Sequence, residues 1–348
     1  MTMYNHKTRQ TINRQRPNDL SVVIPVHTRH LPKLLVLIDS LNESLQSVKY
    51  KWEIVAVVSP LKHTSLKKQK ISLSLRKNLH LTYSNAGLSP ATARNFGAKR
   101  AKGKTLLFVD SDMEFNHKTF YKLKKYIYLL ESKNPVASIY PNFLKPKEFE
   151  SQLQRCEFLE DLRSYESYKD GKYIKTLSGG FCLVRKGVFK KLGGFNEKIG
   201  ASEDREFAAR LINSGYKIIV AKDINVYHSY PSSLKNILRR KRWHAKGNAK
   251  LSYIFPEFFD RPLLKWVKTN IKRVWYAAPR LDYSYILYTL FVITYYTVWF
   301  YYYKSKNRVL YAKLVNTGAT PERALAMREA MALSISPDSK NYVSQKKS

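Results

Sequence analysis

The chain has 348 residues, of which 44% are hydrophobic, so it is long enough for one large α/β domain with an appended segment. Its 62 Lys and Arg against 26 Asp and Glu give a formal charge of +36, which attracts nucleic acid, an anionic membrane surface or phosphate-bearing substrates. Cys156 and Cys182 have neither metal-ligand spacing nor a disulfide framework, which favours a reduced intracellular setting. Composition thus argues against a disulfide-stabilised fold but does not choose among the polyanions.

The first half of the chain predicts a parallel sheet. Residues 1–19 are polar and basic, so we expect a flexible arm without a secretory signal. The apolar segment 20–26, with Pro25 near its end, predicts a strand. Residues 31–46 have apolar side chains at helical spacing, and 52–58 form a second apolar segment. This strand–helix–strand order is typical of an α/β sheet.

A pair of acids follows the most apolar strand of the chain. After a basic segment at 62–77 and a short strand at 79–83, Ser89 and Pro90 are suited to begin a helix that ends near residue 100. Residues 105–109 then predict a strand that is buried on both faces. Asp110 and Asp112 come directly after it, at the edge where open α/β sheets bind ligands. The pair either holds a divalent cation or caps the next helix.

Further candidates lie downstream. Ser202 is expected to cap a helix whose first turn holds Glu203 and Asp204, and such acids either complement the helix dipole or perform chemistry. His228 ends a strand that begins near residue 216. A lone His of this kind is more often structural than a metal ligand. The acids at 148–170 are expected to form a solvated helix face. The less favoured alternative is that they bind a cationic or hydroxyl-rich acceptor.

Residues 283–303 carry no formal charge and are long enough to span a bilayer, yet eight of them are Tyr. Basic residues flank the segment on both sides: Lys265, Lys268, Lys272, Arg273, Arg280, Lys304, Lys306, Arg308 and Lys313. We expect it to lie in the interface with its flanks on anionic headgroups, although a single span stays open. A short helix is expected at 320–335, followed by a disordered tail.

Taken in order, several short motifs resemble those of the family-2 glycosyltransferases with the GT-A fold. They are Val22–Pro25, Asn85-x-Gly87, Ala93–Gly97, Asp110–Asp112, Ser178–Gly180, Gly193–Glu197 and Glu203-Asp204. The resemblance covers roughly residues 20–245 and implies a Rossmann-like, mixed but mainly parallel sheet with flanking helices. It divides the chain into the arm (1–19), a GT-A domain (20–250, with a nucleotide-sugar half to 115 and an acceptor half from 116), a membrane-associated helical segment (251–310) and a tail (311–348).

The resemblance also implies roles for particular residues. Asp112, supported by Asp110 and His228, would hold Mn²⁺ or Mg²⁺ against the donor's diphosphate. Asp204 would be the base of an inverting transfer, and Glu203 would contact the acceptor. The implied donor-binding residues are Pro25, Val26, Arg94, Asp110, Ser111, Arg242 and Trp243, and the acceptor-side residues are Gly179 and Gly180.

Four features leave alternatives open. Ser59 stands where many relatives carry acids that bind the nucleobase, so the preference for uridine is open. Arg94 is either a phosphate ligand or a surface arginine, and Arg242 with Trp243 either clamps substrates or belongs to a basic helix lying on lipid. Arg239 replaces the Gln of the polymerising members' motif, so processivity is not inferred.

The sequence therefore predicts a metal-dependent glycosyltransferase at the cytoplasmic face of the cell membrane. Its donor would be a nucleotide sugar, most simply a UDP-sugar, and its acceptor a lipid-linked glycan or cell-surface polysaccharide. A peptide or small-molecule acceptor is the enzymatic alternative, and a non-catalytic polyanion- or membrane-binding protein is the alternative of another class. Because basic residues are spread along the chain, we expect no specific nucleic-acid partner.

Overall fold

A computed structural model describes residues 19–46, 48–59, 78–116, 118–132, 134–259, 271, 275 and 282–315, with the backbone alone at 163, 164 and 308–315. Residues 1–18 of the expected arm (1–19), the basic segment 62–77, the helix at 320–335 and the tail beyond it lie outside the described residues.

The described part of the chain is built on one sheet with the strand order β3-β2-β1-β4-β8-β6-β9-β5, and β7 pairs with β9. The strands are β1 (Leu20–His27), β2 (Trp52–Ser59), β3 (Leu79–Tyr83), β4 (Thr105–Val109), β5 (Met113–Phe115), β6 (Val136–Leu144), β7 (Tyr173–Ile174), β8 (Phe181–Arg185) and β9 (Lys217–His228). The sheet is parallel from β3 to β4, whereas β8 runs antiparallel to both of its neighbours. The predicted strands are confirmed, and the expected mainly parallel sheet is parallel only in its first half and mixed beyond β4.

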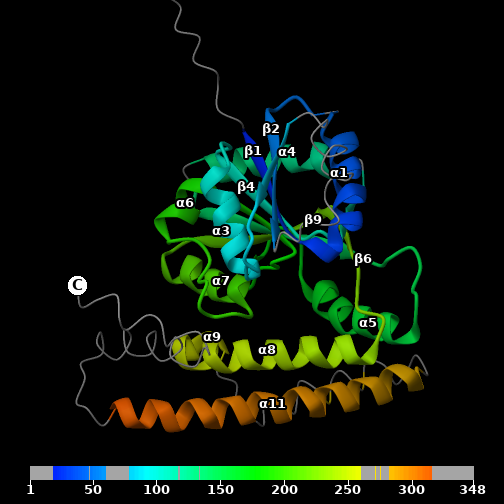
Figure 1. Ribbon diagram of the computed structural model, residues 1–348, viewed down its shortest axis with the longest axis vertical. Helices are drawn as coiled ribbons and strands as arrows, with labels where there is room; N and C mark the ends of the chain where they lie inside the picture. The colour runs from blue at the N-terminus through cyan, green and yellow to red at the C-terminus, as the bar shows by residue number, and fades with distance from the viewer. Residues whose placement is uncertain are drawn as a thin grey trace, which may run out of the picture.

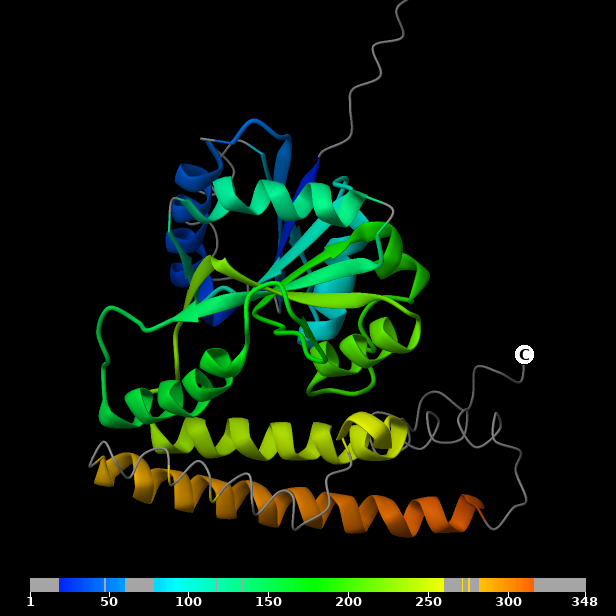
Figure 2. The same ribbon diagram turned by 180° about the vertical axis from the view of Figure 1, so that it is seen from behind.

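Helices cover both faces of this sheet (Figures 1 and 2). They are η1 (Thr28–His30), α1 (Leu31–Gln46), α3 (Pro90–Arg100), α4 (Lys118–Glu131), α5 (Gln152–Ser167), α6 (Lys186–Lys191), α7 (Glu203–Asn213), α8 (Leu234–Ile254), α9 (Pro256–Phe259) and α11 (Tyr283–Val315). Helices α1 and α4 lie on one face and α3 on the other, so β1 and β4 are buried between layers. This explains why β4 is apolar throughout, since all five of its residues are buried.

An aromatic cluster joins β4 to the helices beneath its carboxyl end. The ring of Phe108 lies 5.0 Å from those of Phe189 and Phe195, and Phe207 of α7 lies 5.2 Å from Phe195. Such tilted and edge-on contacts are favourable and rigid. They hold the start of α7 against the end of β4, which positions the site described below.

Helices α8 and α11 lie side by side below the sheet, with α5 between them and the domain (Figures 1 and 2). Glu157 of α5 has a fully buried side chain that accepts hydrogen bonds from Arg240 of α8 and Tyr288 of α11, and its carboxylate lies 2.8 Å from the Nζ of Lys241. The prediction of a solvated acidic face is therefore wrong at Glu157, because this acid is buried among cations of a helix 83 residues away.

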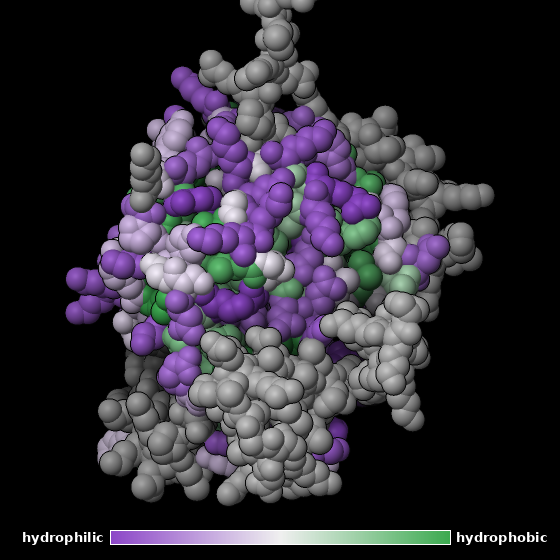
Figure 3. Space-filling view, turned by 90° about the vertical axis from the view of Figure 1, so that its left-hand side faces the viewer, coloured by the Kyte–Doolittle hydropathy of each residue, from purple (hydrophilic) through white to green (hydrophobic). Residues whose placement is uncertain are grey.

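The predicted helix at 283–303 is confirmed and continues to Val315. Among the described residues, none of the helices combines the length and hydropathy needed to cross a bilayer. The predicted domain boundary at residue 250 falls within α8. On the side of the molecule that carries α6, hydrophilic residues predominate at the surface (Figure 3).

Candidate active site

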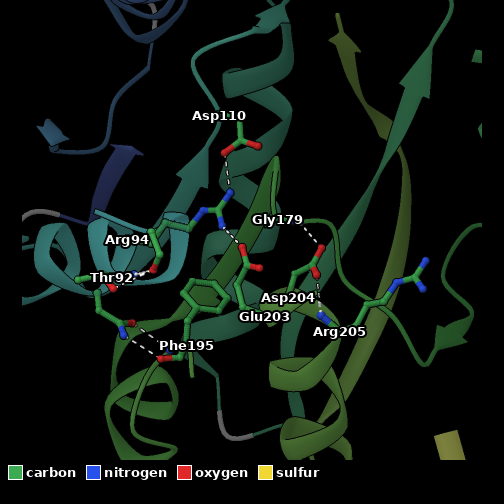
Figure 4. Close-up of polar contacts among 10 residues, drawn as sticks. Thr92, Arg94, Asp110, Gly179, Phe195, Glu203, Asp204 and Arg205 are labelled. Carbon is green, nitrogen blue, oxygen red and sulfur yellow. Dashed lines mark hydrogen bonds and ion pairs between the residues drawn. The ribbon is translucent and has the colours of Figure 1, made fainter. Parts of the chain in front are cut away.

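Arg94 connects three elements at the carboxyl edge of the sheet (Figure 4). It lies on α3, which begins as predicted: the Ser89 hydroxyl accepts a hydrogen bond from the Thr92 N–H at 3.1 Å, and Pro90 is the first helical residue. Its Nη2 donates to Asp110 Oδ1 at 2.6 Å, and its Nη1 donates to Glu203 Oε1 at 2.5 Å. One guanidinium therefore ties the end of β4 to the start of α7.

The surroundings of this arginine keep it charged. Burial by itself lowers the pKa of Arg94, but the carboxylates of Asp110 and Glu203 outweigh that effect and raise it. Burial raises the pKa of Glu203, while Arg94 opposes the rise and Asp204 adds to it. The expected direct contact of Arg94 with phosphate differs from this geometry, since its side chain is only 3% exposed and both terminal nitrogens are engaged. We assign it to positioning Asp110 and Glu203.

Asp204, the residue after Glu203, is more accessible. Its Oδ2 accepts a hydrogen bond from the Gly179 N–H at 2.8 Å, and its Oδ1 accepts one from the Arg205 N–H at 2.8 Å. Each carboxylate oxygen keeps lone pairs for a further donor. Of the two predicted acids, Asp204 is thus oriented and available, whereas Glu203 is buried.

Gly179 and Gly180 allow the backbone to approach these side chains closely. A Cβ at Gly179 would lie 3.2 Å from Arg94 Nη2 and 3.4 Å from Asp204 Oδ2, and one at Gly180 would lie 3.5 Å from Asp110 Oδ2. The Asp110 N–H also donates to the Gly180 carbonyl at 3.2 Å. The predicted acceptor-side pair therefore frames the acidic cluster; whether it also contacts an acceptor stays a prediction.

The start of α7 differs from the prediction in one respect. Ser202 is the N-cap residue, but its φ of 63° and ψ of 32° place it in the left-handed region, and its hydroxyl makes no capping bond. The hydroxyl is buried without a hydrogen-bond partner among the described residues. The predicted side-chain cap is therefore wrong, and this conformation costs a non-glycine residue about 1–2 kcal/mol.

Asp112 and His228 form the candidate metal pair. β5 and β9 pair with Met113 opposite His228, and the Ser229 N–H donates to the Asp112 carbonyl at 3.2 Å. Asp112 Oδ1 lies 3.9 Å from His228 Nε2, and both side chains are partly exposed. Two ligands at about 2.1 Å from one ion can be up to about 4.2 Å apart, so the pair fits a divalent cation.

The predicted third member of the metal set is not gathered with this pair. Asp110 directs Oδ1 to Arg94. Within the described ranges, three or more His, Cys, Asp or Glu suited to one ion are not found together. The role of Asp110 as a supporting ligand therefore stays a prediction.

Asn95, next to Arg94, fastens a loop that sequence reasoning left without a role. Its side chain donates to the carbonyl of Phe195 and to Glu197 Oε1, both at 2.8 Å, and accepts from the Phe195 N–H at 2.9 Å. The guanidinium of Arg94 lies 5.8 Å from the centre of the Phe195 ring. Asn95 therefore fixes the loop at Phe195 and Glu197, and its position next to Arg94 in the sequence was the available signal for this role.

The remaining predicted residues lie apart from these contacts. Arg242 stacks 3.6 Å from the centre of the Trp299 ring and donates to the Tyr303 hydroxyl at 3.2 Å, and Trp243 is 39% exposed on the same helix. This geometry differs from the expected substrate clamp. Pro25 and Val26 end β1, and Ser111 is buried between the two acids, so their donor-binding roles stay predictions.

Ser59, at the end of β2, stands where a base-binding acid was expected. Its hydroxyl accepts a hydrogen bond from the Leu88 N–H at 3.3 Å, which fastens the loop before α3. A hydroxyl used in this way supplies no carboxylate for a nucleobase, so the preference for the base is left to other residues.

A Rossmann-like sheet with acids at its carboxyl edge, and a further acid on an opposing helix, defines the GT-A class of sugar transferases. The model of the glycosyl transferase family 2 matches residues 21–193, and that of glycosyl transferase family group 2 matches residues 137–311. The chain belongs to glycosyltransferase family 2.

Individual relatives are more distant. The O-antigen chain rhamnosyltransferase WbaN of Salmonella anatum is 44% identical over 59 residues, which is 16% of this chain and 19% of that protein. The probable glycosyltransferase YdaM of Bacillus subtilis is 24% identical over 213 residues, 60% of this chain and 48% of that protein. The matches thus span a fifth to a half of these two relatives.

Among solved structures, the mannosyltransferase PcManGT of Pyrobaculum calidifontis, in complex with GDP-Man and Mn²⁺, superimposes with a TM-score of 0.56. It is 16% identical, and the match covers 92% of this chain and 86% of that one. At this identity the likeness supports the fold.

Proposed function

We propose that this protein is an inverting, metal-dependent glycosyltransferase that moves a sugar from a nucleotide diphosphate to an acceptor hydroxyl. The observation that carries the proposal is the convergence of two groups at one sheet edge. One is the Arg94–Glu203 pair with the available carboxylate of Asp204, and the other is the Asp112–His228 pair. The first group suits a base on the acceptor side, and the second suits an ion on the donor side.

Asp204 is the proposed base. Its carboxylate is held by two backbone N–H groups and removes the proton of the acceptor hydroxyl as that oxygen attacks the anomeric carbon. A single displacement of this kind inverts the configuration at that carbon. Glu203 was expected to contact the acceptor, but its burial gives it the role of anchoring Arg94. Arg94 in turn fixes Asp110 beside the donor's expected position.

Asp112 and His228 are the residues that would hold Mn²⁺ or Mg²⁺. When bound, such an ion stabilises the negative charge that develops on the leaving diphosphate. The Mn²⁺ in the complex of the mannosyltransferase from Pyrobaculum calidifontis supports this choice of metal. We propose a UDP-sugar as the donor. GDP-sugars are the competing outcome, because Ser59 supplies no base-binding acid and the mannosyltransferase complex holds GDP-Man.

The donor side is tested by thermal shift with Mn²⁺ and a panel of UDP- and GDP-sugars. We expect a metal-dependent shift that Asp112→Asn removes and Asp204→Asn retains. Asp170→Asn, an exposed acid of a loop, is the matched control. If Asp112→Asn shifts like the unaltered protein, the assignment of the metal pair is wrong.

The base is tested by transfer to an acceptor found by screening lipid-linked and free glycans. Asp204→Asn is expected to lower turnover about 10²- to 10⁴-fold. Transfer with retained anomeric configuration, or full turnover by Asp204→Asn, would contradict the mechanism. Polyanion binding as the only activity of the unaltered protein would favour the non-catalytic alternative.

We further propose that the protein lies on the anionic, cytoplasmic face of the cell membrane and acts on a lipid-linked or cell-surface glycan. α11 bears exposed apolar side chains at helical spacing, on the helix farthest from the sheet (Figure 1): Tyr283, Leu287, Leu290, Phe291, Val298 and Tyr302. Arg242 reaches from α8 to Trp299 and Tyr303 of α11, and Lys235 and Arg239 lie exposed on the same helix as Arg242. An apolar stripe beside basic residues is the pattern of helices that bind at the surface of anionic bilayers.

Flotation with liposomes tests this placement. We expect binding to vesicles that contain phosphatidylglycerol, weaker binding to phosphatidylcholine alone, and loss of binding in Leu287→Glu. Val36→Glu is the control, since Val36 of α1 is 64% exposed and Leu287 is 69% exposed. Equal binding of Leu287→Glu and the unaltered protein would refute the orientation.

A further inference from the structure

A cavity of about 380 Å³ lies between the end of β6 and α5, outside the groups assigned above. Its walls include Phe143, Phe149, Phe158, Leu159, Leu162 and Tyr165. This volume is at the lower end of the range of about 300–1,000 Å³ that is usual for small-molecule sites. The accessible surface of the walls is mainly apolar, which suits an alkyl chain better than a sugar.

Three cations line the same cavity, against one acid, Glu166. Arg155 is paired with Asp282 at 2.6 Å, and the Nζ of Lys222 donates to the carbonyl of Tyr165. Lys145 is exposed, and its Nζ lies 5.5 Å from the centre of the Phe149 ring. The charge balance of the lining is thus positive, and Lys145 can turn towards an anionic group at the mouth.

The cavity is linked to the candidate centre by a short series of side chains. The hydroxyl of Tyr165 lies 3.4 Å from that of Tyr230, and the ring of Tyr230 lies 5.0 Å from the ring of His228. On its other side, α5 packs on α11, where Arg155 meets Asp282 just before the helix begins. These contacts place the cavity between α11 on one side and, through Tyr165 and Tyr230, His228 on the other.

We propose that this cavity binds the apolar chain of an anionic amphiphile, an alkyl or polyprenyl phosphate, with Lys145 at the anionic group. The further step, that this amphiphile is the lipid part of the glycan acceptor, rests on the proposed function, whereas binding of the amphiphile in the cavity does not. The ligand's apolar chain contacts Phe143, Phe158 and Leu159, and Tyr165 of the lining connects the cavity through Tyr230 to His228.

The test is calorimetric titration of the whole protein with decyl phosphate below its micellar concentration, without nucleotide or metal. We expect saturable binding of one molecule, about tenfold weaker binding of octyl phosphate because two methylenes are lost, and none of inorganic phosphate. Leu159→Trp, which fills the cavity, should weaken binding at least tenfold. Lys145→Glu should also weaken it about tenfold, whereas Lys147→Glu, an exposed lysine of the same loop outside the lining, should not.

Several outcomes would overturn the proposal. One is absence of binding by the unaltered protein, and another is equal affinity in Lys145→Glu and Lys147→Glu. Loss of binding in Leu287→Glu would place the ligand on α11 instead of in the cavity. Circular dichroism checks that Leu159→Trp folds, and Lys145→Glu keeps the test decisive if it does not. Donor binding with Mn²⁺ is measured on the same samples, so failure of the cavity and failure of the proposed transferase are separate results.

Discussion

Replacing Arg94 with Met tests whether one buried arginine holds the acidic cluster together. The change removes a guanidinium that is 3% exposed and leaves Glu203, with a side chain 6% exposed, without its cation. Removing one partner of a buried ion pair costs about 3–5 kcal/mol. Against a typical total of about 5–15 kcal/mol, the variant should fold but unfold at a clearly lower urea concentration.

A second substitution should restore part of the lost stability. In Arg94→Met/Glu203→Gln no charge is left unpaired at Glu203, so we expect at least half of the lost free energy of unfolding to return. Lys125→Met is the control, because Lys125 is 61% exposed in its pair with Asp223 and should cost less than about 1 kcal/mol.

The free energy of unfolding of Arg94→Met should also depend on pH. Burial already raises the pKa of Glu203, and loss of Arg94 removes the charge that opposes the rise. A carboxyl whose folded pKa exceeds its unfolded pKa destabilises the protein as pH increases through that window. The difference in free energy of unfolding between Arg94→Met and the unaltered protein should therefore shrink as pH falls from 7.5 to 5. If Arg94→Met lowers the free energy of unfolding by less than about 1 kcal/mol, or the double variant regains none of it, the bridging role of Arg94 is refuted.

Three further predictions concern packing near the site. Burial lowers the pKa of Lys250 to about 8. Between pH 8 and 10 the unfolded chain therefore binds more protons than the folded protein, so the free energy of unfolding should rise with pH in that range. In urea titrations, Lys250→Met should abolish this rise and increase the free energy of unfolding at pH 7 by about 3 kcal/mol. Gly247→Ala should cost about 1–3 kcal/mol because its Cβ would lie 2.5 Å from the Ala201 carbonyl oxygen, whereas Gly187→Ala, with nothing within 4 Å, should not destabilise. Ser202→Gly should raise the melting temperature, since glycine relieves about 1 kcal/mol of left-handed strain; a lower melting temperature would contradict this.

Local patterns accounted for most of the secondary structure. The strand 105–109, the start of α3 at Pro90 and the long helix from Tyr283 follow from burial on both faces, from a Ser-Pro cap and from an uninterrupted apolar segment. Each of these signals lies within one continuous segment of the chain, so the sequence alone carries it. The predicted side-chain cap at Ser202 is wrong because this residue has a left-handed conformation, in which its hydroxyl makes no capping bond.

The identity of the acidic residues was likewise available from the sequence, but their division of labour was not. Glu203 and Asp204 are neighbours of the same chemistry, yet one is buried against Arg94, 109 residues away, and the other remains available beside Gly179. Glu157 was expected in solvent and lies among the cations of α8. Composition and spacing determined that this protein is an α/β protein with acids at a sheet edge. Which acid is buried, which is free and which faces His228 was decided by long-range packing, because the environment of a charge depends on segments that are distant in the chain.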